Sequence, residues 1–197
     1  MAKKLPRVAL PVSARRRPRA PIALTGIPGT GKSSVAERLA PRWRSVEVGV
    51  LAVERGCARR RPGGWEVDLP RLARSLRRRP AVEVDLVVGH LAHLLPVRFA
   101  IVLRCRPTEL YRRLTRAGRG SRTERGENAV AEALDAIGAE VRARQIPYRE
   151  IDASGRSISA VARSLDRLLR AGPRPAAPRV DWLGDRRETA HLLDWGP

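Results

Sequence analysis

The chain has almost no lysine. Of its 40 basic residues only three are lysines, and the others are arginines. Lys3 and Lys4 lie at the extreme N-terminus, so Lys32 is the only lysine in the rest of the sequence. Arginine carries a planar, bulky guanidinium, whereas lysine is a compact charge on a flexible stem. A position that keeps lysine in such an arginine-rich chain therefore indicates a place where only the smaller cation fits.

Cysteine and long apolar runs are also scarce. Cys57 and Cys105 provide neither a disulfide framework nor a CxxC metal motif, which favours a reducing, cytoplasmic compartment. No stretch approaches the roughly 18 apolar residues of a membrane helix. The apolar piece at residues 8–12 is short and contains Pro11. We therefore expect neither a signal peptide nor a membrane partner.

Aromatic and acidic residues are the two remaining shortages. Aromatic residues make up 4% of the chain and apolar residues 43%, so the core of a single domain must consist mostly of aliphatic side chains. With only 20 acidic residues, the net charge is +20 at pH 7. Such a charge favours a polyanionic partner such as nucleic acid. A proteome-wide preference for arginine, or a hot habitat, explains it equally well.

Short apolar runs alternate with helical patterns between residues 21 and 172. Strands are predicted at 21–25, 46–50, 83–88, 99–103 and 148–152. Helices are predicted at 33–39, 69–76, 108–114, 130–141 and 158–169, with Thr108 as the cap of the third. This alternation predicts an α/β fold, a parallel sheet of about five strands flanked by helices. Residues 1–20 read as a disordered basic arm, and 173–197 as a proline-rich linker with a tryptophan-bearing tail.

The segment 26–33 reads GIPGTGKS and matches the phosphate-binding loop pattern GxxxxGK[ST]. An apolar strand precedes it and a helix follows it, which is the context that this loop requires. Its glycines let backbone N–H groups converge on phosphates at a helix N-terminus. Lys32 is expected to bridge the β- and γ-phosphates, Ser33 to coordinate Mg²⁺, and Ser34 to support the α-phosphate. The predicted nucleotide-binding residues are Gly29, Gly31, Lys32, Ser33 and Ser34.

A second polar turn follows the strand at 83–88, where phosphate-loop proteins place an acidic residue. Val88 occupies that last strand position, and Asp85 lies roughly 10 Å further back along the strand. His90 is then the best-placed polar side chain. It is either a catalytic residue that orients water or handles a proton, or merely the cap of a turn. His93 lacks a third partner, so its spacing does not indicate a metal site.

An arginine cluster follows the helix at 108–114. Phosphoryl transfer depends on cations around the developing charge, and a glycine-hinged arginine loop makes a natural closing lid. An ordinary solvated basic loop at 117–126 is the alternative. The members of the cluster are Arg112, Arg113, Arg116, Arg119, Arg122 and Arg125.

The order of these motifs resembles that of the adenylate-kinase-like ATPases of small-ribosomal-subunit maturation. This family has archaeal members and also includes a human coilin-interacting nuclear ATPase. The resemblance covers about residues 21–170. It rests on GIPGTGKSS, VEVGVLAVERG, EVDL, VVGHLAHLLP, VLRCRPTELYRRL and GENAVAEALDAI. It implies a nucleoside-monophosphate-kinase fold with an NMP-binding segment at about 47–70 and a lid at about 116–126. It further implies ATP and Mg²⁺ as cofactors, AMP as acceptor, and a platform ribosomal protein and rRNA of the pre-ribosome as partners.

The chain departs from this family at two places. The family usually has Asp or Glu where Val88 stands. Its lid arginine directly precedes a glycine, whereas here Ala117 precedes Gly118, which leaves Arg116 and Arg119 as the nearest substitutes. Three functions therefore stay open: a slow adenylate kinase or ATPase, a nucleotide-gated RNA or ribosome assembly factor with little turnover, and a small-molecule kinase on the same fold.

Overall fold

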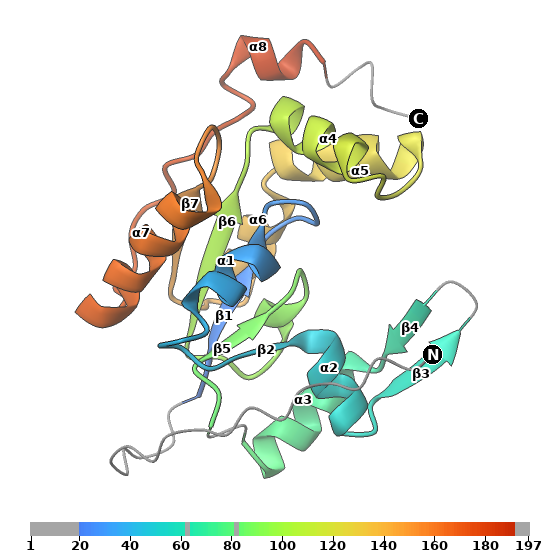
Figure 1. The fold of residues 1–197 in the computed structure, drawn as a ribbon, viewed down its shortest axis with the longest axis vertical. Coiled ribbons are helices and arrows are strands. Elements are labelled where there is room, and N and C mark those ends of the chain that lie inside the picture. The colour runs from blue at the N-terminus through green and yellow to red at the C-terminus, as the bar shows by residue number, and fades with distance from the viewer. Residues whose placement is uncertain (1–19, 62–63, 81–82, 192–197) are drawn as a thin grey trace.

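Five short strands form one parallel sheet in the computed structural model, which describes residues 20–61, 64–80 and 83–191 (Figure 1). The order is β2-β5-β1-β6-β7. Their bounds are β1 Ile22–Thr25, β2 Ser45–Glu47, β5 Leu86–Val88, β6 Phe99–Arg104 and β7 Tyr148–Asp152. The three central strands are buried throughout, as expected for a parallel sheet covered on both faces. This confirms the predicted α/β fold.

Helices cover both faces of the sheet and divide the core in two. α1 (Lys32–Leu39) and α7 (Ile158–Ala171) pack on the face that carries Leu24 and Ile101. The opposite face carries Ala23 and Val102. It is covered by α2 (Val48–Glu54), α3 (Leu69–Arg78), α4 (Pro107–Arg116) and α6 (Ala136–Ala143). The remaining elements are the hairpin β3 (Ala58–Arg61) and β4 (Gly64–Val67), η1 (Ala92–Leu94), α5 (Arg122–Ala133) and α8 (Arg186–Thr189).

The second and third strands are shorter than predicted. β2 ends at Glu47, and the expected strand residues 48–50 instead begin α2. Val48, Leu51 and Ala52 are buried at helical spacing, so packing of this helix overrides the strand preference of valine. β5 begins only at Leu86, and the Asp85 side chain just before it accepts a hydrogen bond from the backbone N–H of Arg44 at 2.9 Å.

The predictions for the α4–α6 region also need correction. α4 begins at Pro107 after Arg106, and Thr108 lies in its first turn instead of capping it. The helix predicted at 130–141 is interrupted at Asp135, which has a positive φ of 51° and starts α6. Leu134 is consequently 57% exposed, although its spacing placed it on the apolar face. The arginine-rich loop is only residues 117–121, because a capping box of Ser121 and Glu124 starts α5 early.

The part of the C-terminal segment that the structure describes, residues 173–191, runs back over β7 toward α4 (Figure 1). Ala176 donates a backbone hydrogen bond to Tyr148. The indole of Trp182 is buried and donates to Glu132 at 3.2 Å. Glu188 is also buried and accepts from both the backbone and the hydroxyl of Thr108. This segment therefore ties the sheet edge to the α4–α5 pair. The predicted arm at 1–20 lies, except for Ala20, outside the described residues, as do residues 192–197 of the tail.

Replacing Trp182 with phenylalanine is expected to lower the free energy of unfolding by about 1–3 kcal/mol, because the hydrogen bond to Glu132 is lost and the smaller ring leaves buried space unfilled. Urea denaturation measures this difference. Trp65→Phe is the matched control, since Trp65 is 57% exposed and its replacement should change stability by less than about 0.5 kcal/mol. Equal effects of the two substitutions would show that the tail hydrogen bond is not stabilising.

Candidate nucleotide-binding site

The loop between β1 and α1 wraps tightly at the carboxyl end of the sheet. Gly26, Gly29 and Gly31 all have positive φ values, of 138°, 92° and 98°. A Cβ at Gly29 would lie 2.8 Å from Leu114 and 2.9 Å from Leu110, both on α4. A Cβ at Gly26 would clash with the carbonyl oxygen of Leu103. The loop can therefore take this shape only with glycine at these positions.

Lys32 starts α1 and folds back into the loop. Its side chain is buried, and its Nζ donates to the carbonyl of Ile27 at 2.9 Å and to the Thr30 hydroxyl at 3.5 Å. Burial lowers its pKa to about 8, the charges of Glu47 and Glu132 act in the opposite direction, and Arg119 adds to the lowering. The amine is therefore mostly charged at pH 7, and an anion in the loop would favour the charged form further.

Ser33 and Ser34 occupy the first turn of α1, and both are exposed. Neither hydroxyl forms a hydrogen bond with a described residue. The helix has no side-chain cap at Gly31 and no acidic residue in its first turn. The first N–H groups of α1 are thus open toward the carboxyl edge of the sheet, as in helix N-termini that bind phosphate.

His90 follows β5 at the same edge and is exposed. Its pKa is lowered by partial loss of hydration and by the charge of Lys32, so the ring is neutral at pH 7 and can accept a proton. Its backbone carbonyl accepts from the Thr25 hydroxyl at 3.2 Å, which fixes the turn to the end of β1. Val88 is buried and offers no polar atom here. Asp85 precedes β5 and lies at the opposite end of that strand.

His93 has a place that sequence analysis missed. It is buried, with Nδ1 3.0 Å from the Thr25 hydroxyl and Nε2 2.7 Å from Glu140 of α6. Burial lowers its pKa, although Glu140 opposes the effect. This histidine joins α6 to the base of the phosphate loop. Its polar neighbours belong to distant segments, so only the tandem GHLAH pattern could have indicated it.

The predicted lid arginines divide into two groups. Arg113 donates to Glu109 and to the carbonyl of Ala153, and Arg125 stacks over Tyr111, 6.0 Å from the ring centroid. These two hold the helices together. Arg116 and Arg119 are exposed and form no hydrogen bond or ion pair with a described residue. Of these two, Arg119 is the one whose charge acts on Lys32. It is therefore the better-placed lid arginine.

A buried ionic cluster lies at the end of β6, and sequence analysis missed it too. Arg104, at the end of β6, bonds Glu132 at 2.7 Å and Glu150 at 3.0 Å and pairs with Asp135 at 2.6 Å. Burial acts to lower the pKa of Arg104, but these carboxylates outweigh it and raise the pKa. Glu132 and Asp135 belong to the GENAVAEALDAI motif. Acidic side chains in the otherwise apolar stretch at residues 129–137 were the sequence signal.

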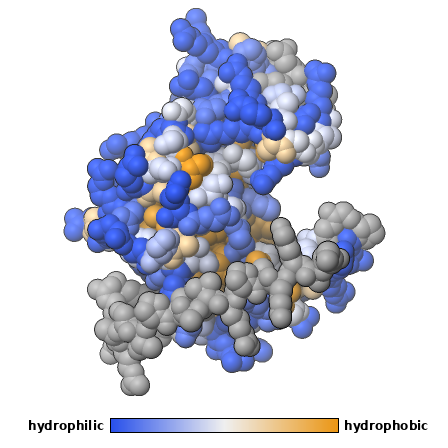
Figure 2. Space-filling view, in the orientation of Figure 1, coloured by the Kyte–Doolittle hydropathy of each residue, from blue (hydrophilic) through white to orange (hydrophobic). Residues whose placement is uncertain are grey.

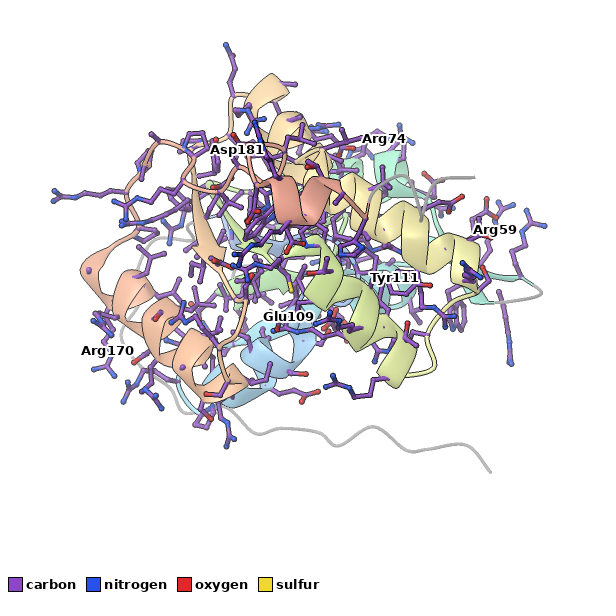
Figure 3. The ribbon with its side chains drawn as sticks, turned by 90° about the horizontal axis from the view of Figure 1, so that it is seen from above. Arg59, Arg74, Glu109, Tyr111, Arg170 and Asp181 are labelled. Atoms are coloured by element: carbon purple, nitrogen blue, oxygen red, sulfur yellow. The ribbon has the colours of Figure 1, made fainter. Side chains whose placement is uncertain are left out.

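The loop faces a hollow on the side of the molecule shown in Figure 2, between the α4–α5 pair and the β3–β4 hairpin. Arginine side chains project outward from the surface, among them Arg59 of the hairpin and Arg74 of α3, which are both exposed (Figure 3). Two other hollows contain none of the predicted site residues. One lies along the C-terminal half of α1 and the other near the amino ends of the strands. The candidate site residues therefore lie together at the carboxyl edge of the sheet.

Several known proteins are similar to this chain in sequence or in fold. A family model described as an AAA domain matches residues 22–135, from β1 through the phosphate loop and α5. A protein of Archaeoglobus fulgidus named "Putative adenylate kinase" is 41% identical over 172 residues, covering 83% of this chain and 92% of that protein. A protein of the same name from Pyrococcus abyssi is 32% identical over 163 residues, covering 82% and 90%. A solved shikimate kinase from Bacteroides thetaiotaomicron superposes with a TM-score of 0.46 at 21% identity, covering 77% and 98%.

Proposed function

We propose that this protein, which belongs to the AAA-domain family and to the archaeal adenylate-kinase-like group of its relatives, transfers the γ-phosphoryl group of ATP to AMP. The observation that carries the proposal is Lys32, held inside a glycine loop at the carboxyl end of the sheet. Relatives that match over almost their whole length and carry the adenylate kinase name support AMP as the acceptor.

The residues at the loop have complementary tasks. Lys32 would leave the Ile27 carbonyl and contact the β- and γ-phosphates, where its charge stabilises the transferred group. The open N-terminus of α1 would hold the phosphates in position. Arg119 would close over them from the lid, adding a second cation and excluding water. Neutral His90 would orient the attacking group or accept its proton.

Ser33 fits a Mg²⁺ ion, because its exposed hydroxyl is a hard oxygen ligand that has no other partner among the described residues. The bound ion would neutralise charge on the β- and γ-phosphates. Val88 provides no carboxylate at the neighbouring strand end, so Ser33 alone is a sparse protein ligand set. Slow turnover is a natural consequence of this arrangement.

The reaction is tested with purified protein, ATP, AMP and Mg²⁺ in a coupled assay for ADP. We expect ADP formation that depends on AMP, and none above background with Lys32→Ala. ATP hydrolysis without AMP would indicate an ATPase instead. Turnover no faster than that of Lys32→Ala under both conditions would refute the enzyme. Phosphorylation of shikimate or a nucleoside in preference to AMP would identify a small-molecule kinase.

Replacing Arg119 with alanine is expected to lower kcat about 10-fold, because a partly solvated cation near the developing charge contributes roughly 1–2 kcal/mol. Arg116→Ala is the matched control. It removes the same charge from the same exposed segment but not from the neighbourhood of Lys32, so its effect should stay below about 2-fold. Steady-state kinetics measures both, and a larger effect at Arg116 would contradict the assignment.

A role in assembly of the small ribosomal subunit is the second candidate function. Its support is the net charge of +20 together with the hairpin, where Arg60 pairs across the strands with Trp65, which is 57% exposed. Exposed cations beside an aromatic ring suit the backbone and bases of single-stranded RNA. We expect binding to small-subunit rRNA that weakens steeply with salt. Binding unaffected by Trp65→Ala would argue against this surface.

A further inference from the structure

The end of β2 is level with the strand end that lacks an acidic residue. β2 and β5 run parallel, and Glu47 pairs in register with Val88, which in turn pairs with Leu24 of β1. Residues in register on parallel strands point to the same face of a sheet. Val88 and Leu24 lie in the core on the α1 side. Glu47 is therefore on the face that α1 covers, at the carboxyl edge where the phosphate loop lies.

The Glu47 carboxylate has no hydrogen-bond or ion-pair partner among the described residues. The residue is half-buried and precedes α2, yet its side chain makes no capping hydrogen bond. It forms no hydrogen bond or ion pair with any described residue. Its negative charge does act on Lys32, where it opposes the effect of burial on the amine pKa. A partly buried carboxylate that faces the phosphate loop without a partner is thus available to a ligand.

We propose that Glu47 replaces the acidic residue missing at Val88, by holding a water ligand of the Mg²⁺ ion that Ser33 would bind. This rests on the proposed ATP-dependent function. Mg²⁺ usually keeps several waters and uses one or two carboxylates together with substrate phosphates. Neighbouring strands are about 4.8 Å apart. The extra methylene of glutamate, about 1.5 Å, and a water-mediated contact of about 2.8 Å cover most of that spacing.

The test compares nucleotide affinity with and without the metal. A fluorescent ATP analogue is titrated into wild type and Glu47→Gln, once in Mg²⁺ and once in EDTA. Wild type should bind more tightly in Mg²⁺. Glu47→Gln should lose about 10-fold of this gain, while its affinity in EDTA equals or exceeds that of wild type, because a carboxylate repels phosphate. Glu37→Gln is the matched control: it removes the same charge from the exposed side of α1 and should behave as wild type.

Two further variants distinguish the effect of side-chain length from the effect of charge. Glu47→Asp keeps the charge but shortens the side chain, so it should lose most of the Mg²⁺-dependent gain. Val88→Asp added to Glu47→Gln should restore the gain, because it places a carboxylate one strand nearer the loop. A purely structural Glu47 would weaken binding equally in Mg²⁺ and EDTA and lower the melting temperature, which would overturn the proposal.

The failure of this inference is distinguishable from the failure of the proposed function. If wild type binds the analogue in a Mg²⁺-dependent way and Glu47→Gln keeps the full gain, Glu47 has no part in metal binding and the kinase proposal stands. If wild type binds no nucleotide under either condition, both proposals fall.

Discussion

Replacing Lys32 with alanine is expected to reduce phosphoryl transfer at least about 100-fold, because a buried cation aimed at the developing charge is lost. Lys32→Arg should be nearly as inactive, although it keeps the charge. The amine lies 2.9 Å from the Ile27 carbonyl inside a loop where even a methyl group at Gly29 would meet α4. A planar guanidinium does not fit in that space. ADP formation in the coupled assay measures both effects.

Arg38→Ala is the control for this pair, since Arg38 lies on the exposed side of the same helix. Its turnover should stay within about 2-fold of wild type. The melting temperature of Lys32→Ala should be close to or above that of wild type, because burial of the amine disfavours its charged form. Activity retained in Lys32→Arg would mean that charge alone, without shape, explains why lysine is kept here.

Replacing Arg104 with methionine is expected to lower the free energy of unfolding by about 3–5 kcal/mol, because the carboxylates of Glu132 and Glu150 lose a buried partner. Guanidinium denaturation measures the loss. Arg42→Met is the matched control. Arg42 also pairs with an acid, Asp166, but its side chain is 56% exposed, so its replacement should cost less than about 1 kcal/mol.

The deficit of Arg104→Met should shrink in acid. Burial raises the pKa of Glu132 above its ordinary value, and the loss of the guanidinium raises it further. The folded variant then binds a proton more tightly than the unfolded chain does, so lowering the pH through the folded-state pKa stabilises it relative to wild type. Adding Glu132→Gln should recover part of the loss at pH 7. A deficit that is independent of pH would mean that lost packing outweighs the unpaired charges.

Local patterns in the sequence were sufficient where a segment's neighbours in the chain decide its structure. The GIPGTGKS loop has its own glycine requirements, and the strand before it and the helix after it follow from apolar runs of the right length. The parallel sheet flanked by helices followed from the alternation of strands and helices, whereas the strand order β2-β5-β1-β6-β7 was not predicted. The predicted roles of Lys32, Ser33 and the lid arginines remain predictions, although the structure brings Lys32 and Arg119 within reach of each other's charge.

Contacts between residues that are far apart in the chain determine the features that the sequence did not reveal. Asp135 interrupts a helical pattern, and its carboxylate pairs with Arg104, which lies on β6 far away in the sequence. Glu188 of the C-terminal segment is buried because it accepts a hydrogen bond from Thr108, and Glu132 of α5 is buried because it pairs with Arg104. A hydrophobic periodicity cannot indicate such pairs, since it counts every charged residue as exposed. Glu47 was not predicted as a site residue for a related reason. Its place beside Val88 depends on the register between β2 and β5.

The scarcity of lysine also has a practical consequence. A protease that cuts only after lysine finds three sites in the chain, at Lys3, Lys4 and Lys32. The third is buried in the glycine loop, so cleavage there requires the loop to open locally. The rate at which residues 33–197 are released therefore reports the opening of one loop without any engineered label. A bound nucleotide should slow that single cut in proportion to its occupancy.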